Sequence, residues 1–178
     1  KDNFMYLNLS YQALIILAVF LFNIPNKALG NDRAKVKRII YSKKDWTPGE
    51  YNIRLKKIAK MGDRAVPYLA EFLAKEKTSE YITNLCYSLQ RAPGVAALEP
   101  LKSYLKKPSS RGGWQDRLNR GLCAQAYGLS LGKKKTPLTD SDLKPVLDIM
   151  LKDKDCTTRQ NVAEEVGKLR IPELRNWF

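Results

Sequence analysis

The sequence predicts an all-α protein in which pairs of helices repeat along the chain as a short α-solenoid. Apolar residues recur at helical spacing, glycine or proline marks the ends of the helices, and the pattern returns. Pro100 stands 33 residues after Pro67, and Pro145 stands 45 residues after Pro100. A period in the thirties with two helices per unit is typical of a solenoid.

The first pair of helices is expected between residues 47 and 73. The motif "TPGE" predicts a helix start, because Thr47 can cap the helix and Glu50 can complete a capping box. Gly62 should end this helix, since glycine tolerates the left-handed conformation common at helix termini. After the short turn "GDR", Pro67 falls in the first turn of a second helix, where its missing N–H costs little.

The stretch "KMGDRAVPYLAEFL" resembles the HEAT repeat of bacterial HEAT-like proteins, in which L-G-D-x-x-A-V-P-x-L joins two helices. Met61 replaces the usual leucine, and the later copies "RAPGVAALEPL" and "SLGKKKTPLTDSDLKPVL" depart further. The resemblance covers about residues 47–178. It implies a right-handed solenoid of three helical hairpins with flanking helices. HEAT-like proteins serve mostly as binding scaffolds, and a few are enzymes.

The N-terminal residues 1–30 predict a signal peptide or a membrane anchor. Ten apolar residues, "ALIILAVFLF", match the core of a secretory signal and are too few for a bilayer-spanning helix. "ALG" (28–30) resembles a cleavage site. The chain is therefore expected in a bacterial periplasm or cell envelope. The alternatives are a retained membrane anchor through residues 4–24 and a helix packed in a soluble core.

Residues 31–46 are strongly basic, with helix-like apolar spacing. They predict a capping helix or linker that covers the open face of the first repeat, with Trp46 helping to seal that end. The C-terminal "RNWF" is expected either to pack on the last hairpin or to dock into a partner.

The amino-acid composition limits both the kind of partner and the kinds of catalysis that this chain can support. The 32 Lys and Arg against 18 Asp and Glu give a net charge of +14, which favours an anionic partner such as an acidic protein or nucleic acid. The absence of histidine excludes Ser-His-Asp and Cys-His catalysis and histidine-ligated metals. No catalytic residue, metal site or cofactor is expected.

Three cysteines leave room for one disulfide without selecting the pair. In the repeat alignment Cys86 and Cys123 both fall where the first repeat has Ile53, so both are expected to be small buried side chains. Cys156, at the start of the last helix, is expected to be accessible.

Two insertions carry the candidate partner-binding residues. The first, "LKKPSSRGGWQDRLNR", combines an aromatic side chain with basic ones, as interface anchors often do. The second is the lysine run of "GKKKTP". Both flank one hairpin, so a shared binding edge is expected; the competing interpretations are that Trp114 folds back onto the protein and that the charges are merely solvated. The candidate residues are Lys106, Lys107, Arg111, Trp114, Arg117, Arg120, Lys133, Lys134 and Lys135.

The expected function is that of a non-enzymatic scaffold that binds another, acidic protein, as a subunit or assembly factor of an envelope or membrane complex. One alternative is nucleic-acid binding, as in the DNA glycosylases that use HEAT-like repeats. The other is an enzyme related to bilin lyases, although no chromophore pocket is evident in the sequence.

Overall fold

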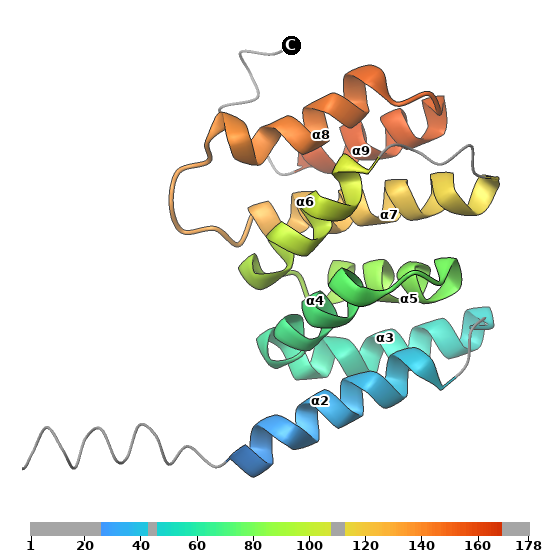
Figure 1. Cartoon of the computed structure of the whole chain (residues 1–178), viewed down its shortest axis with the longest axis vertical. Coiled ribbons are helices and arrows are strands. Elements are labelled where there is room, and N and C mark those ends of the chain that lie inside the picture. Colours follow the sequence, from blue (N-terminus) through green and yellow to red (C-terminus); the bar gives the residue numbers. More distant parts are fainter. Residues whose placement is uncertain (1–25, 43–45, 108–112, 169–178) are drawn as a thin grey trace, which may run out of the picture. The chain divides into compact units, whose positions relative to one another are not determined.

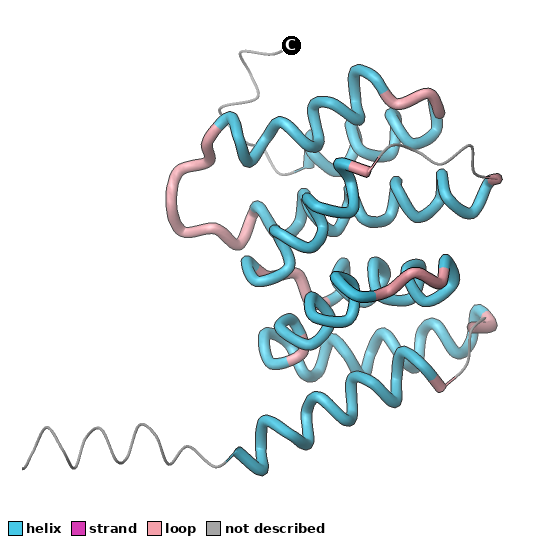
Figure 2. Tube along the Cα trace, in the orientation of Figure 1, coloured by secondary structure: helices cyan, strands magenta, loops and turns pink. Residues whose placement is uncertain are grey.

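The computed structural model describes residues 26–42, 46–107 and 113–168. The chain divides into two compact units, 1–34 and 35–178. Of the first unit only 26–34 is described, as the beginning of a helix, and the following account concerns the second. The described residues form helices joined by turns and contain no strand, so the protein is all-α as predicted (Figure 2).

Eight α-helices and two short 3₁₀ helices make up the described part of the chain. In order they are α2 (Asn26–Tyr41), α3 (Pro48–Met61), η1 (Gly62–Arg64), α4 (Val66–Lys75), α5 (Ser79–Arg91), η2 (Val95–Ala97), α6 (Leu98–Lys106), α7 (Trp114–Leu131), α8 (Asp140–Lys152) and α9 (Cys156–Lys168).

The helices of the second unit pack in two rows (Figure 1). One row contains α3, α5, α7 and α9, each in contact with the next. The other contains α4, α6 and α8, again in contact in that order, and the chain alternates between the rows. A continuous hydrophobic core runs between the rows because each helix presents an apolar stripe to its neighbours.

Local sequence signals define the helix ends as predicted. Thr47 caps α3 through a reciprocal capping box with Glu50, and Gly62 ends the helix with a positive φ of 53°. Thr139 and Asp142 form a second capping box at the start of α8. Each box satisfies backbone N–H groups that have no partner within the helix.

The three aligned prolines do not occupy equivalent positions. Pro67 is the second residue of α4 and Pro100 the third residue of α6, both within the first turn. Pro145, by contrast, is the sixth residue of α8 and is buried inside the helix. The capping box at Thr139 starts α8 one turn earlier than the proline alignment implies.

A disulfide joins α5 to α7 through Cys86 and Cys123, whose Cα atoms are 5.0 Å apart. Both cysteines are fully buried, as expected, and Cys156 is free and exposed, also as expected. The alignment with Ile53 is wrong, however, because the Ile53 side chain is 58% exposed. Within its row α3 has a neighbour on one side only, α5, so part of its surface stays open.

Buried polar contacts accompany the disulfide between α5 and α7. Thr83 donates a hydrogen bond to the Asn119 side-chain oxygen (2.6 Å), and the Asn119 amide donates to the Ser79 carbonyl (2.9 Å). Gln115 in turn donates to the Thr83 hydroxyl (2.7 Å). Because unpaired buried polar groups are costly, these contacts fix the register of the two helices.

Tyr41 anchors the end of α2 to the helices that follow. Its ring packs edge-on against Phe72 (5.7 Å between centroids) and contacts Tyr81 (4.8 Å). Burial, together with a hydrogen bond to Glu76, raises the pKa of the Tyr41 hydroxyl well above its usual value. Trp46, as predicted, is buried at this end of the unit, with its ring 5.1 Å from that of Tyr51.

Several predictions concern residues outside the described ranges. They are the apolar segment of residues 4–24, Arg111 and the C-terminal "RNWF". The predicted junction between residues 30 and 31 falls within α2.

Candidate functional site: a cation-lined groove between α2 and α3

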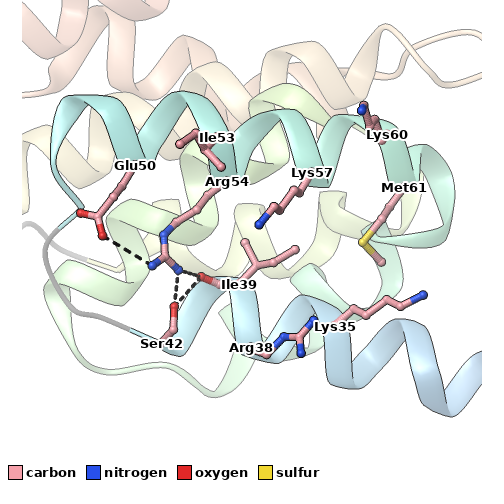
Figure 3. A pocket seen from close by; sticks show the side chains of 10 residues that line it. All are labelled: Lys35, Arg38, Ile39, Ser42, Glu50, Ile53, Arg54, Lys57, Lys60 and Met61. Carbon is pink, nitrogen blue, oxygen red and sulfur yellow. Dashed lines mark hydrogen bonds and ion pairs between the residues drawn. The ribbon is translucent and has the colours of Figure 1, made fainter.

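A groove of about 500 Å³ lies between the last two turns of α2 and one face of α3 (Figure 3). The lining positions on each helix recur every three or four residues, which places them on one helix face. They are Lys35, Arg38 and Ile39 on α2, Ser42 directly after it, and Glu50, Ile53, Arg54, Lys57, Lys60 and Met61 on α3. Five of these ten residues are cationic.

Arg54 links the two helices at one end of this groove. Its guanidinium donates to the Ile39 carbonyl (2.8 Å) and to the Ser42 hydroxyl, both at the end of α2. It also forms an ion pair with Glu50 (3.7 Å) and lies 5.2 Å from the centre of the Trp46 ring. Arg54 is therefore a structural clamp, and its charge is largely compensated within the protein.

The other four cations have no such partners. Lys35, Arg38, Lys57 and Lys60 are exposed and form no ion pair with any residue of the described ranges. Apolar side chains lie between them: Ile39 and Met61 are half-buried and Ile53 is mostly exposed. Figure 3 shows Lys57 and Met61 extending from α3 toward α2, with Lys35 and Arg38 on the facing wall. The groove thus combines uncompensated positive charge with accessible apolar surface.

A second, smaller cavity of about 310 Å³ lies between the first half of α7 and the start of α9. Trp114 borders it and is 67% exposed, so this side chain does not fold back onto the protein. Arg117 also lines it and pairs with Asp155 at 3.7 Å. These two predicted site residues are therefore brought together on an accessible surface.

Arg120 requires a correction, because it is not available to a partner. Only 9% of the residue is exposed, and its guanidinium donates to the Asp153 carboxylate (2.9 Å) and the Lys107 carbonyl (2.9 Å). In the amphipathic α7 this position faces inward, next to the ends of α6 and α8. Arg120 is a structural residue that joins three helices.

The predicted shared edge also requires a correction. The two insertions lie at opposite ends of α7, which has 18 residues and is therefore about 27 Å long. Lys106 and Lys107 are exposed at the end of α6, and Lys133 and Lys135 are exposed just after α7. The exposed Lys133 and Lys135 therefore do not form one surface with Trp114.

Lys134, unlike its two neighbours, is held within the protein. Its ammonium group lies 2.7 Å from the Asp142 carboxylate, which also accepts hydrogen bonds from the Thr139 backbone (2.9 Å) and hydroxyl (2.8 Å). Burial alone would raise the pKa of Asp142, but the bonds from Lys134 and Thr139 outweigh it and hold the pKa below its usual 3.8.

The variant Asp142→Asn is expected to lose about 1 kcal/mol of stability at neutral pH. Because folding lowers the pKa of Asp142, its contribution is complete above pH 3.8 and disappears as the pH falls through the folded-state pKa. The free energy of unfolding, measured with urea from neutral pH to about pH 2, should therefore fall less steeply with decreasing pH in the variant than in the wild type. Asp140→Asn, an exposed change in the same turn, is the control. Identical acid profiles for Asp142→Asn and the wild type would contradict this role.

No group of three or more His, Cys, Asp or Glu side chains that could hold a metal ion occurs among residues 26–42, 46–107 and 113–168. Within the same ranges, none of the helices combines the length and the apolar character needed to cross a bilayer.

Comparisons with protein families, curated proteins and solved structures give no match to this chain. The assignment of function therefore depends on the surfaces just described. The α2–α3 groove was not among the sequence-predicted sites, although "DRAKVKRIIYSKK" and "EYNIRLKKIAKM" each place cations three residues apart on one helix face.

Proposed function

We propose that this chain is a non-enzymatic scaffold that binds an acidic protein, built as a short HEAT-like α-solenoid in an exported or membrane-anchored protein. The two rows of alternating helices support the solenoid interpretation, because each helix pair contacts the pairs before and after it. Such an array presents side chains on a rigid surface, which suits binding without a conformational change.

The Cys86–Cys123 disulfide supports an exported location. Disulfides form and persist in oxidising compartments such as the bacterial periplasm and are rare in the cytosol. The apolar run in the first thirty residues points in the same direction. Alkylation of cells before lysis provides the test: Cys156 should react while Cys86 and Cys123 stay protected. If all three cysteines are alkylated after the protein is unfolded without reductant, the disulfide is absent in the cell, and this result would argue against export.

The observation that carries the binding proposal is the α2–α3 groove. Uncompensated cations repel one another, and exposed apolar surface is unfavourable in water. Both features therefore destabilise the groove when it is unoccupied and favour binding of a partner there. An acidic partner with apolar contact residues would relieve both costs. Positive charge also raises the rate of encounter with such a partner.

Site-specific photo-crosslinking in the native cells tests this function. A photoreactive amino acid at Ile53, on the rim of the groove, is expected to give a protein adduct, whereas one at the exposed Val95, which does not line the groove, is not. The adduct should weaken severalfold with Lys35→Gln/Lys57→Gln. The matched control is Lys37→Gln/Lys56→Gln, which removes two exposed charges from the same helices outside the groove.

Three outcomes would count against the proposal. An adduct at Ile53 that nuclease removes would favour the nucleic-acid alternative. An adduct equally reduced by both lysine pairs would indicate attraction to overall charge alone. If Ile53 gives no adduct but Trp114 does, and Trp114→Ala/Arg117→Ala abolishes it, the α7–α9 surface is the functional one.

A further inference from the structure

From the shape and charge of the α2–α3 groove, we infer that its occupant is an amphipathic α-helical segment of the partner, with a cluster of carboxylates at one end. This inference rests on the proposed function and specifies how the partner is bound.

The dimensions of the groove suit a helix. On α3 the lining positions run from Glu50 to Met61, a rise of about 16 Å, or three helical turns. The facing wall, from Lys35 of α2 to Ser42 just after this helix, contributes about two turns. A helix laid against two neighbouring helices contacts both through residues spaced at i, i+3, i+4 and i+7.

The apolar positions indicate which face of the ligand helix is bound. Ile39 from α2 and Met61 from α3 are half-buried between the two helices, and Ile53 is mostly exposed at the edge of the groove. Two or three apolar side chains on one face of a short helix would cover these three residues. A peptide bound by strand addition would instead require an unpaired strand edge, and the described residues contain no strand.

The charges give the ligand helix a direction. At one end Arg54 is already engaged by Glu50 and by the end of α2, so that end offers little net charge. At the other, Lys35 and Arg38 of α2 lie opposite Lys57 of α3 without partners in the described ranges, and Lys60 extends from the outer side of α3, away from α2 (Figure 3). Two or three carboxylates within one turn of the ligand would pair with this cluster, and apolar residues would follow toward Arg54.

Other anionic partners fit less well. Sequence-tolerant binding of single-stranded nucleic acid relies on aromatic stacking, and none of the ten described residues that line the groove is aromatic. A flat membrane surface would reach Ile53 and the lysines but not Ile39 and Met61, which are half-buried between the helices. The recessed apolar residues therefore favour a convex helical ligand.

Fluorescence anisotropy with the purified full chain tests the inference. The probe is a labelled fourteen-residue helical peptide, with leucines on one face and three glutamates in its first turn. The reference is a scrambled peptide of the same composition. At about 0.15 M salt the helical peptide is expected to bind at least about tenfold more tightly. Lys35→Gln/Lys57→Gln and Ile53→Ser should each remove most of that difference, whereas Lys37→Gln/Lys56→Gln should change it less than about twofold.

Equal binding of the two peptides would overturn the inference. So would tighter, groove-dependent binding of single-stranded DNA or of vesicles with 30% anionic lipid. Circular dichroism of each variant verifies that the fold is intact. If groove-dependent crosslinking in cells succeeds while the helical peptide fails, the binding function stands and only the helical mode of recognition is wrong. If the crosslink also fails, the function itself is wrong.

Discussion

Loss of the Cys86–Cys123 disulfide is expected to destabilise the protein by about 4 kcal/mol, because the bond closes a loop with a sequence separation of 37. In the chain-entropy description, the crosslink restricts the unfolded chain far more than the folded one. Urea unfolding followed by circular dichroism should therefore show a large drop in midpoint for Cys86→Ser/Cys123→Ser. The wild type should show a similar drop in reductant.

The remaining cysteine supplies the control for this experiment. Cys156 is exposed and outside the disulfide, so Cys156→Ser should leave the midpoint unchanged with and without reductant. The assignment of the disulfide would be contradicted if reductant had no effect on the wild type. It would also be contradicted if Cys156→Ser removed the effect of the reductant.

Removal of the Asp153 carboxylate should cost about 3–5 kcal/mol, because it leaves the Arg120 guanidinium charged and buried without its counter-ion. Arg120 and Asp153 have side chains only 11% and 5% exposed, and two backbone carbonyls of the α6 terminus accept further hydrogen bonds from Arg120. The variant Asp153→Ala should unfold at a much lower urea concentration. The double variant Arg120→Met/Asp153→Leu should recover most of the loss, since a packed apolar pair avoids the desolvation cost.

A neighbouring ion pair provides a matched comparison. Arg117 and Asp155 also join α7 to the segment before α9, but Arg117 is 53% exposed and the pair is longer, at 3.7 Å. Arg117→Ala is therefore expected to cost no more than about 1 kcal/mol. If Arg117→Ala and Asp153→Ala proved equally costly, burial would not be what makes the Arg120 pair important.

Features set by adjacent residues were predictable from the sequence. The capping box of Thr47 and Glu50, the positive φ at Gly62 and the proline in the first turn of α4 each depend on contacts within a few residues. Helical spacing likewise predicted the helices themselves. Such signals are readable because the physical cause and the residues that encode it lie side by side in the chain.

Features set by packing were not predictable in the same way. The sequence allowed one disulfide but not the choice of Cys86 with Cys123, which depends on how α5 lies against α7. Arg120 was predicted as one more cation of a basic loop, although its position in the second turn of the amphipathic helix α7 places the side chain inward. Ile53 was matched to buried positions because the alignment does not show that α3 lacks a second neighbour in its row.

The α2–α3 groove illustrates the same limit for function. Lys35 and Arg38 on one helix and Lys57 on another come together only after the two helices are placed side by side. Each helix by itself resembles an ordinary solvated surface. The sequence drew attention instead to Trp114 and the lysine run, which are conspicuous in the chain but lie apart in space.

The length of α7 limits what one ligand can touch. Trp114 begins this helix and the exposed Lys133 and Lys135 follow its end, so a rod of about 27 Å stands between them. A metabolite, a headgroup or a short peptide bound at Trp114 would not contact either lysine. A ligand that contacts both ends must itself extend for about 27 Å, and two small molecules could occupy the two ends at once without colliding.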